Sequence, residues 1–99
     1  MSDLELRFDS GVAALMGELT FATVPEMLER EAELLDKVED ELKVDLAQVS
    51  RGDSAGLALL VAWVRCAKQK NKSVRFLNVP SQLREMAKVS DLEEVLSLS

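Results

Sequence analysis

The chain begins with two segments in which apolar and polar residues alternate. Leu4, Leu6 and Phe8 alternate with charged residues, and a polar turn at 9–11 leads into a second strand-like stretch at 12–19. Alternation with a period of two is typical of strands that bury one face. These segments therefore predict a β-hairpin.

The next segment has helical spacing. Thr23 is followed three residues later by Glu26, with Pro25 in the first turn, which predicts a capping box and a helix over 24–38. We expect the acidic residues of this helix to lie on a solvated face. Its apolar positions are Val24, Met27, Leu28, Leu34, Leu35 and Val38.

Strand and helix patterns then alternate to the end of the chain. In order, they are a strand at 42–46, a strongly apolar helix over 56–70, a strand at 74–79, a short helix after Pro80, and a last helical turn opened by a second capping box at Ser90 and Glu93. This order implies a largely parallel sheet after the opening hairpin. The expected fold class is α/β, with residues 1–99 forming one domain.

The junction before the apolar helix is the candidate functional site. Asp53 and Ser54 are both good N-cap residues, and Gly56 permits a close approach to a neighbouring element. A hydroxyl at Ser54 would lie beside unpaired backbone N–H groups and the positive end of the helix dipole. Two interpretations follow: Ser54 caps the helix, or Asp53 caps it and leaves Ser54 facing a partner.

The apolar side chains of the helix over 56–70 cover an arc of roughly 220°, about twice the usual width. We expect the sheet and neighbouring helices to cover this arc, with Trp63 in the core; an exposed Trp63 would instead be an interface anchor. The remaining arc begins with Ala58 and Ala62 and continues to Arg65. Its small residues would let the backbone of another protein approach closely.

Composition limits the chemistry open to this chain. It has no histidine, which removes imidazole acid–base catalysis and the commonest nitrogen ligand for metals, and we expect neither a metal ion nor a cofactor. The single cysteine, Cys66, lies within the apolar helix, where a small buried side chain is favoured over a reactive thiol. An enzyme built on carboxylates such as Glu39, Asp40 and Asp45 is disfavoured, because nothing in the pattern directs them towards a common pocket. No catalytic residue is predicted.

Charge is distributed unevenly along the chain. The net charge is −6, yet residues 24–45 contain nine acids and three bases, whereas residues 65–88 contain seven bases and one acid. The basic region has only Phe76 for stacking, so a solvated face that complements an acidic partner is favoured over nucleic-acid binding. No apolar run reaches the ~20 residues that span a bilayer, and the start lacks a secretory signal. We therefore expect a cytoplasmic protein without direct membrane insertion.

Four segments carry a family resemblance. They are Val-Asp-Leu at 44–46, Asp-Ser-Ala-Gly-Leu at 53–57, Val-Arg-Phe-Leu-Asn-Val at 74–79 followed by Pro80, and the spaced apolar pattern from Leu83 to Leu96. Together they resemble the STAS domain family, which includes domains of sulfate transporters and anti-sigma factor antagonists. The resemblance implies a mixed four-stranded sheet with helices packed mainly on one face. It also implies a function in binding partners rather than in catalysis.

Two subgroups of this family give different expectations. In the anti-sigma factor antagonists, the serine after the motif aspartate is phosphorylated by a partner kinase, and that position is Ser54 here. This chain differs from them at Ala55, where antagonists usually carry a second hydroxyl residue. The run 53–60 is more similar to the cytoplasmic STAS subunit of the Mla ABC transporter, which moves phospholipids in the envelope of Gram-negative bacteria. In that subgroup the position of Ser54 contacts the ATPase subunit.

The resemblance thus implies a non-enzymatic accessory subunit that binds the ATPase of a phospholipid-transporting ABC complex, supports outer-membrane lipid asymmetry, and lies at the inner membrane through that complex. The alternative is an anti-sigma factor antagonist that binds an anti-sigma factor kinase and is switched by phosphorylation of Ser54. The expected partner-binding residues are Asp53, Ser54, Ala55, Ala58, Ala62 and Arg65.

Overall fold

Four strands form one mixed sheet in the computed structural model, which describes residues 4–28 and 30–97. The strands are β1 (Leu4–Asp9), β2 (Val12–Leu19), β3 (Glu41–Gly52) and β4 (Ser73–Leu77), and they lie in this order across the sheet. β1 and β2 are antiparallel, whereas β3 is parallel to both of its neighbours. The mixed α/β class expected from the sequence is confirmed.

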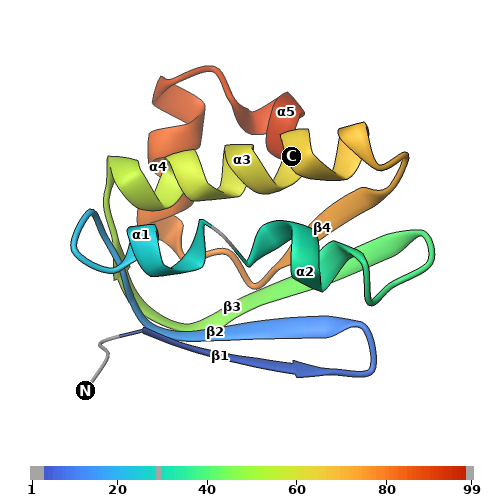
Figure 1. The fold of residues 1–99 in the computed structure, drawn as a ribbon. Coiled ribbons are helices and arrows are strands. Elements are labelled where there is room, and N and C mark those ends of the chain that lie inside the picture. The colour runs from blue at the N-terminus through green and yellow to red at the C-terminus, as the bar shows by residue number, and fades with distance from the viewer. Residues whose placement is uncertain (1–3, 29, 98–99) are drawn as a thin grey trace.

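The helices of the described residues lie on one side of this sheet, as Figure 1 shows. They are α1 (Val24–Met27), α2 (Glu31–Leu35), α3 (Ser54–Gln69), α4 (Ser81–Val89) and α5 (Glu93–Leu96). α3 occupies the middle, with α1 and α2 along one flank and α4 and α5 along the other (Figure 1). It contacts all four of these helices as well as β3 and β4, which explains how so wide an apolar arc is covered. Trp63 is fully buried, as predicted.

The N-terminal hairpin is also confirmed. Ser10 and Gly11 form its two-residue turn, and both have positive φ, 52° and 82°. Positive φ at both central positions is the geometry whose twist matches that of the flanking strands. β1 and β2 therefore pair without a bulge from Leu4 opposite Gly17 to Asp9 opposite Val12.

The single helix predicted over 24–38 is wrong, because the structure has the two short helices α1 and α2 there. Between them, the N–H of Arg30 donates to the Met27 oxygen at 3.0 Å, only three residues back. This turn is tighter than that of an α-helix and ends the regular ladder. Leu28, placed on the apolar face by its spacing, is half exposed.

The predicted capping box at Thr23 does not form either. Thr23 precedes α1, but its backbone is helical (φ −110°, ψ −29°) rather than extended, and its side chain accepts no hydrogen bond from the helix. Its hydroxyl instead donates to the Glu18 oxygen at 2.7 Å and accepts from the Thr20 N–H at 3.0 Å. Thr23 therefore closes the loop after β2.

Three other predicted boundaries change. β3 continues beyond 46 to Gly52, because it stays paired with β2 through two register shifts. β4 ends at Leu77, since Asn78 has φ 55° and leaves the extended region. The second capping box is wrong: Ser90 ends α4, and the Leu92 N–H donates back to the Ala87 oxygen at 2.7 Å.

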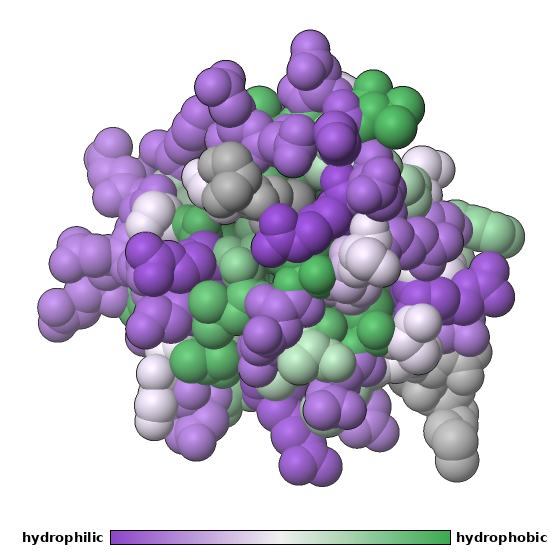
Figure 2. All heavy atoms as spheres, turned by 180° about the vertical axis from the view of Figure 1, so that it is seen from behind, coloured by the Kyte–Doolittle hydropathy of each residue, from purple (hydrophilic) through white to green (hydrophobic). Residues whose placement is uncertain are grey.

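The back of the molecule has an ordinary mixed surface. Figure 2 shows apolar side chains in the middle of this face, separated by polar side chains into small areas. Scattered apolar exposure of this kind is normal for proteins and needs no functional explanation. A longer lining of small and apolar side chains lies on the helical side, along α3.

Candidate functional site

Asp53 joins β3 to α3 and caps the helix. Its extended backbone (φ −124°, ψ −167°) is the conformation that an N-cap residue prefers. Oδ1 accepts hydrogen bonds from the N–H groups of Ala55 (2.9 Å) and Gly56 (3.2 Å), and Oδ2 accepts one from the N–H of Phe21 at 3.1 Å. Desolvation raises the pKa of this carboxyl, but the three hydrogen bonds and the charge of Arg51 outweigh it and hold the pKa below its ordinary value.

Ser54 is the first residue of α3 and is exposed. Of the two interpretations of the junction, the structure has the one in which Asp53 is the cap, so the Ser54 hydroxyl is left on the surface. Gly56 makes the close approach predicted for it, because a Cβ there would collide with the main-chain oxygen of Leu19. The first turn of α3 can therefore lie directly against the end of β2.

A groove of about 740 Å³ runs along the free face of α3. On one side it is bounded by Glu31 of α2, and on the other by Ser90 and Leu92, which link α4 to α5. Its α3 lining recurs at helical spacing: Ser54, Leu57, Ala58, Val61, Ala62, Arg65, Cys66 and Gln69. At 1.5 Å per residue this stripe is about 22 Å long.

The structure brings together four of the six residues expected to bind a partner. Ser54, Ala58, Ala62 and Arg65 all line this groove. Asp53 and Ala55 do not line it; they lie at the start of α3, where they form the cap.

Glu31 is an unusual acid within this groove. The expectation that the acids of 24–38 are solvated is wrong for this residue, which is only 6% exposed. Its Oε1 atom is buried and has no hydrogen-bond partner among residues 4–28 and 30–97. Burial raises its pKa from 4.5 to about 7, so that the carboxyl is partly ionised at neutral pH.

Cys66 lies beside Glu31 in the same groove and is only partly buried, less so than predicted for a core side chain. Burial raises the pKa of the thiol, and the charge of Glu31 raises it further, against a smaller opposite effect of Lys70. A thiol with a raised pKa is a poor nucleophile at neutral pH. The raised pKa agrees with the prediction that Cys66 is not a reactive cysteine.

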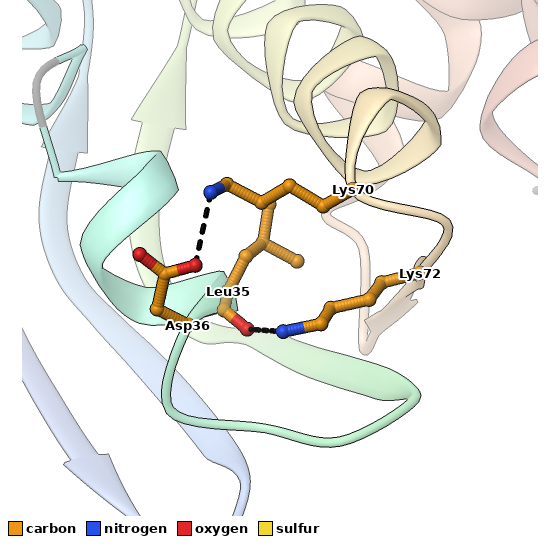
Figure 3. A network of polar contacts seen from close by, with 4 residues as sticks. All are labelled: Leu35, Asp36, Lys70 and Lys72. Atoms are coloured by element: carbon orange, nitrogen blue, oxygen red, sulfur yellow. Dashed lines mark hydrogen bonds and ion pairs between the residues drawn. The ribbon is translucent and has the colours of Figure 1, made fainter.

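Two lysines hold α2 in its position beside α3, as Figure 3 shows. Lys70 Nζ lies 2.9 Å from Asp36 Oδ1, and Lys72 Nζ donates to the main-chain oxygen of Leu35 at 2.7 Å. The hydrogen bond and charge of Lys70 lower the pKa of Asp36. These contacts fix the C-terminal end of α2, the helix that carries Glu31 into the groove.

Two residues that matter to this site were missed by the sequence reasoning. The main-chain N–H of Phe21 donates a hydrogen bond to Asp53 beside the start of α3, and the residue is 77% exposed. An aromatic residue in the polar loop between strand and helix patterns was the available signal for Phe21. Glu31 had a signal too, because it lies one turn from both Met27 and Leu35, on the buried side of its helix.

Two other classes of site find no support among the described residues. No helix within residues 4–28 and 30–97 combines the length and apolar character needed to cross a membrane. Within the same ranges, no three acids or cysteines come together in a way that could hold a metal ion. Asp45, one of the carboxylates considered for catalysis, lies within β3. It accepts one hydrogen bond from the Ala47 N–H of the same strand and one from the side-chain amide of Asn78, the residue that follows β4.

Comparison with known proteins agrees with this architecture. A family model described as "Mlab, STAS domain" matches residues 2–98. The chain belongs to the STAS domain family.

The curated relatives include the anti-sigma-B factor antagonists of Staphylococcus epidermidis, 29% identical over 83 residues, and of Staphylococcus aureus, 28% identical over 83 residues. Each alignment covers 84% of this chain and 77% of the relative. Similar solved structures are the phosphorylated form of the Bacillus cell fate determinant SpoIIAA (TM-score 0.69, 17% identity, 92% of this chain and 86% of that one) and an anti-sigma factor antagonist from Mycobacterium paratuberculosis (TM-score 0.69, 18% identity, 94% and 80%). At these identities the solved structures establish the fold.

Proposed function

We propose that this chain is a non-enzymatic STAS domain that binds a partner protein through the start of α3 and the groove beside it. The observation that carries the proposal is the exposed Ser54 at one end of a stripe of small and apolar side chains. Ala58 and Ala62 hold no side chain beyond Cβ, so a segment of another protein can approach the helix backbone there. Such approach gives the close packing that specific interfaces need.

For the partner, we propose the ATPase subunit of a phospholipid-transporting ABC complex. The chain would then be a cytoplasmic accessory subunit that reaches the inner membrane only through this complex. The description of the matching family model supports this partner. Ala55 supports it too, because the antagonist pattern has a second hydroxyl residue at that position.

A second candidate is an anti-sigma factor antagonist controlled by a kinase. The relatives and the similar solved structures are themselves named as anti-sigma factor antagonists or as SpoIIAA, and they support this candidate more directly than the first. The geometry also accommodates a phosphate switch. Asp53 already binds the N–H groups of Ala55 and Gly56, so a phosphate on Ser54 would add about −1.5 to −2 charge beside a carboxylate instead of being neutralised by those donors. A partner surface would meet that charge directly.

Purification of the tagged chain from its native host, with mass spectrometry of the bound proteins, tests the proposal. We expect an ABC ATPase subunit to be recovered in a fixed ratio with the chain. Recovery of a kinase-like anti-sigma factor, with phosphate on Ser54 after incubation with ATP, would replace the first partner with the second. Recovery of neither would contradict the proposed site.

Ser54→Asp then locates the contact. We expect this variant to bind the partner at least tenfold more weakly than the wild type, because charge and bulk are added at the docking surface. Ser81→Asp is the matched control, since Ser81 is likewise the exposed first residue of a helix, α4, and lies outside the groove. Equal loss of binding in both variants would show that Ser54 has no special place in the interface.

A further inference from the structure

We propose that Glu31 selects the partner: it receives a lysine or arginine side chain from the protein segment that occupies the groove of α3. The inference rests on the proposed function and gives the chemistry of the segment that binds there. Glu31 was not among the residues expected at the interface, and it belongs to α2 rather than to the motif at the start of α3.

Glu31 lacks a hydrogen-bond donor for one of its carboxyl oxygens. The residue is more than nine-tenths buried and lines the groove, and its Oε1 atom is buried without a donor among the described residues. A buried carboxyl oxygen normally has a hydrogen-bond partner, and leaving it without one is costly. A donor from a bound segment would remove that cost at the moment of binding.

Glu31 makes no ion pair with any of the described residues. Arg65 is the only basic residue of the groove lining, and it makes no ion pair with Glu31 among the described residues. The other titratable group of the lining is Cys66. Its thiol is either neutral or negatively charged, so it cannot act as a cation for Glu31. From the α4–α5 side come only the uncharged Ser90 and Leu92.

A positively charged donor fits Glu31 better than a neutral one. A carboxyl with a pKa near 7 is easily ionised by a nearby positive charge, and the resulting charge-assisted hydrogen bond is about twice as strong as a neutral one. The segment that contains Glu31 is also negatively charged, since residues 24–45 carry nine acids and three bases, and it would attract a cationic segment. The complementary segment is therefore one that presents a lysine or arginine among apolar side chains.

The test uses the partner subunit recovered with the tagged chain, and measures its dissociation constant at pH 6 and at pH 8. Glu31→Gln keeps the size of the side chain and removes its charge. We expect this variant to bind about tenfold more weakly than the wild type at pH 8 and nearly as well at pH 6, where Glu31 is largely protonated. Glu33→Gln is the matched control: it makes the same charge change on the same helix, at an exposed residue that lies outside the groove lining. It should bind like the wild type at both pH values.

Three outcomes are informative. If Glu31→Gln binds like the wild type at pH 8 while Ser54→Asp loses binding, the role of Glu31 is refuted and the proposed function stands. If the wild type binds more tightly at pH 6 than at pH 8 and Glu31→Gln abolishes that trend, Glu31 donates a proton to an acceptor and the cationic segment is refuted. If the wild-type chain recovers no partner, the proposed function fails together with this inference. Urea unfolding followed by the fluorescence of buried Trp63 verifies that each variant is folded.

Discussion

The main-chain N–H of Phe21 donates a hydrogen bond to Oδ2 of Asp53 at 3.1 Å, between residues 32 positions apart in the sequence. The other carboxylate oxygen of Asp53 caps α3. One side chain thus fixes both the loop after β2 and the start of the helix that carries Ser54. The position of Ser54 in space depends on this pair.

Replacement of Asp53 should therefore destabilise the fold by more than the loss of a simple cap. We expect Asp53→Ala to lower the free energy of unfolding by about 2 kcal/mol, because three N–H donors lose their acceptor. Asp53→Asn should cost about 1 kcal/mol, since an amide keeps one acceptor oxygen for the cap. Urea unfolding followed by Trp63 fluorescence measures both values, and equal stability of Asp53→Ala and wild type would contradict the role of the carboxylate.

The same variants have a defined pH dependence. The folded pKa of Asp53 is lower than its ordinary value of 3.8, so ionised Asp53 stabilises the fold above that value. The stabilisation is lost as the pH falls through the lower, folded pKa. The advantage of wild type over Asp53→Asn should accordingly be constant near neutrality and shrink below about pH 4. An advantage that grows on acidification would contradict this assignment.

Gly56→Ala should destabilise the protein although alanine is the better helix former. An added Cβ meets the main-chain oxygen of Leu19, which cannot move aside as a flexible side chain would. We expect a loss of at least about 2 kcal/mol in the free energy of unfolding. Ala58→Gly, at an exposed position two residues further along α3, should cost only the helix propensity difference of about 1 kcal/mol. Gly56→Ala as stable as the wild type would show that the start of α3 can move away from β2.

Glu31→Gln should stabilise the protein in alkaline solution. Because the pKa of Glu31 is raised in the folded state, folding binds a proton between pH 4.5 and about 7, and wild-type stability falls as the pH rises through this range. The variant should be equal to the wild type near pH 4 and more stable at pH 8, by at most about 3 kcal/mol. Glu33→Gln, at an exposed site, should follow the wild type throughout. A Glu31→Gln variant less stable at pH 8 would show that the carboxylate has a partner in the folded state.

Cys66 gives an independent measure of the charge on Glu31. Since the charge of Glu31 is one cause of the raised pKa of the Cys66 thiol, Glu31→Gln should lower that pKa. A larger fraction of thiolate should then react, and alkylation at pH 8 should be faster than in the wild type. Cys66 is the only cysteine, so the total rate of labelling is its rate. An unchanged rate would show that the two side chains do not interact.

Much of the fold could be predicted because its strongest patterns are local. Alternation in 4–19, Gly11 in the hairpin turn, and the wide apolar arc around Trp63 each specify an element by themselves. The break between α1 and α2 had no such signal, because the apolar spacing of Val24, Met27, Leu34 and Leu35 continues across it. There the packing against α3 decides the path of the chain.

The site divides in the same way. The sequence shows that either Asp53 or Ser54 could cap α3, but not which of them does. Asp53 is held at the cap by a hydrogen bond from the N–H of Phe21, a donor that comes from a distant segment. The spacing of Glu31 from Met27 and Leu35 places it on the buried side of its helix, but this spacing does not show that its carboxyl lacks a hydrogen-bond partner. Its environment is created by α3 and by the α4–α5 link, and those neighbours appear only when the chain is folded.

The groove beside α3 is bounded by α2 on one side and by the link between α4 and α5 on the other. A groove that is bounded on two sides can bind only one protein segment at a time. Any two proteins that rely on Ser54 would have to exclude each other, so their relative abundance, and not only their affinities, would decide which complex exists in a cell.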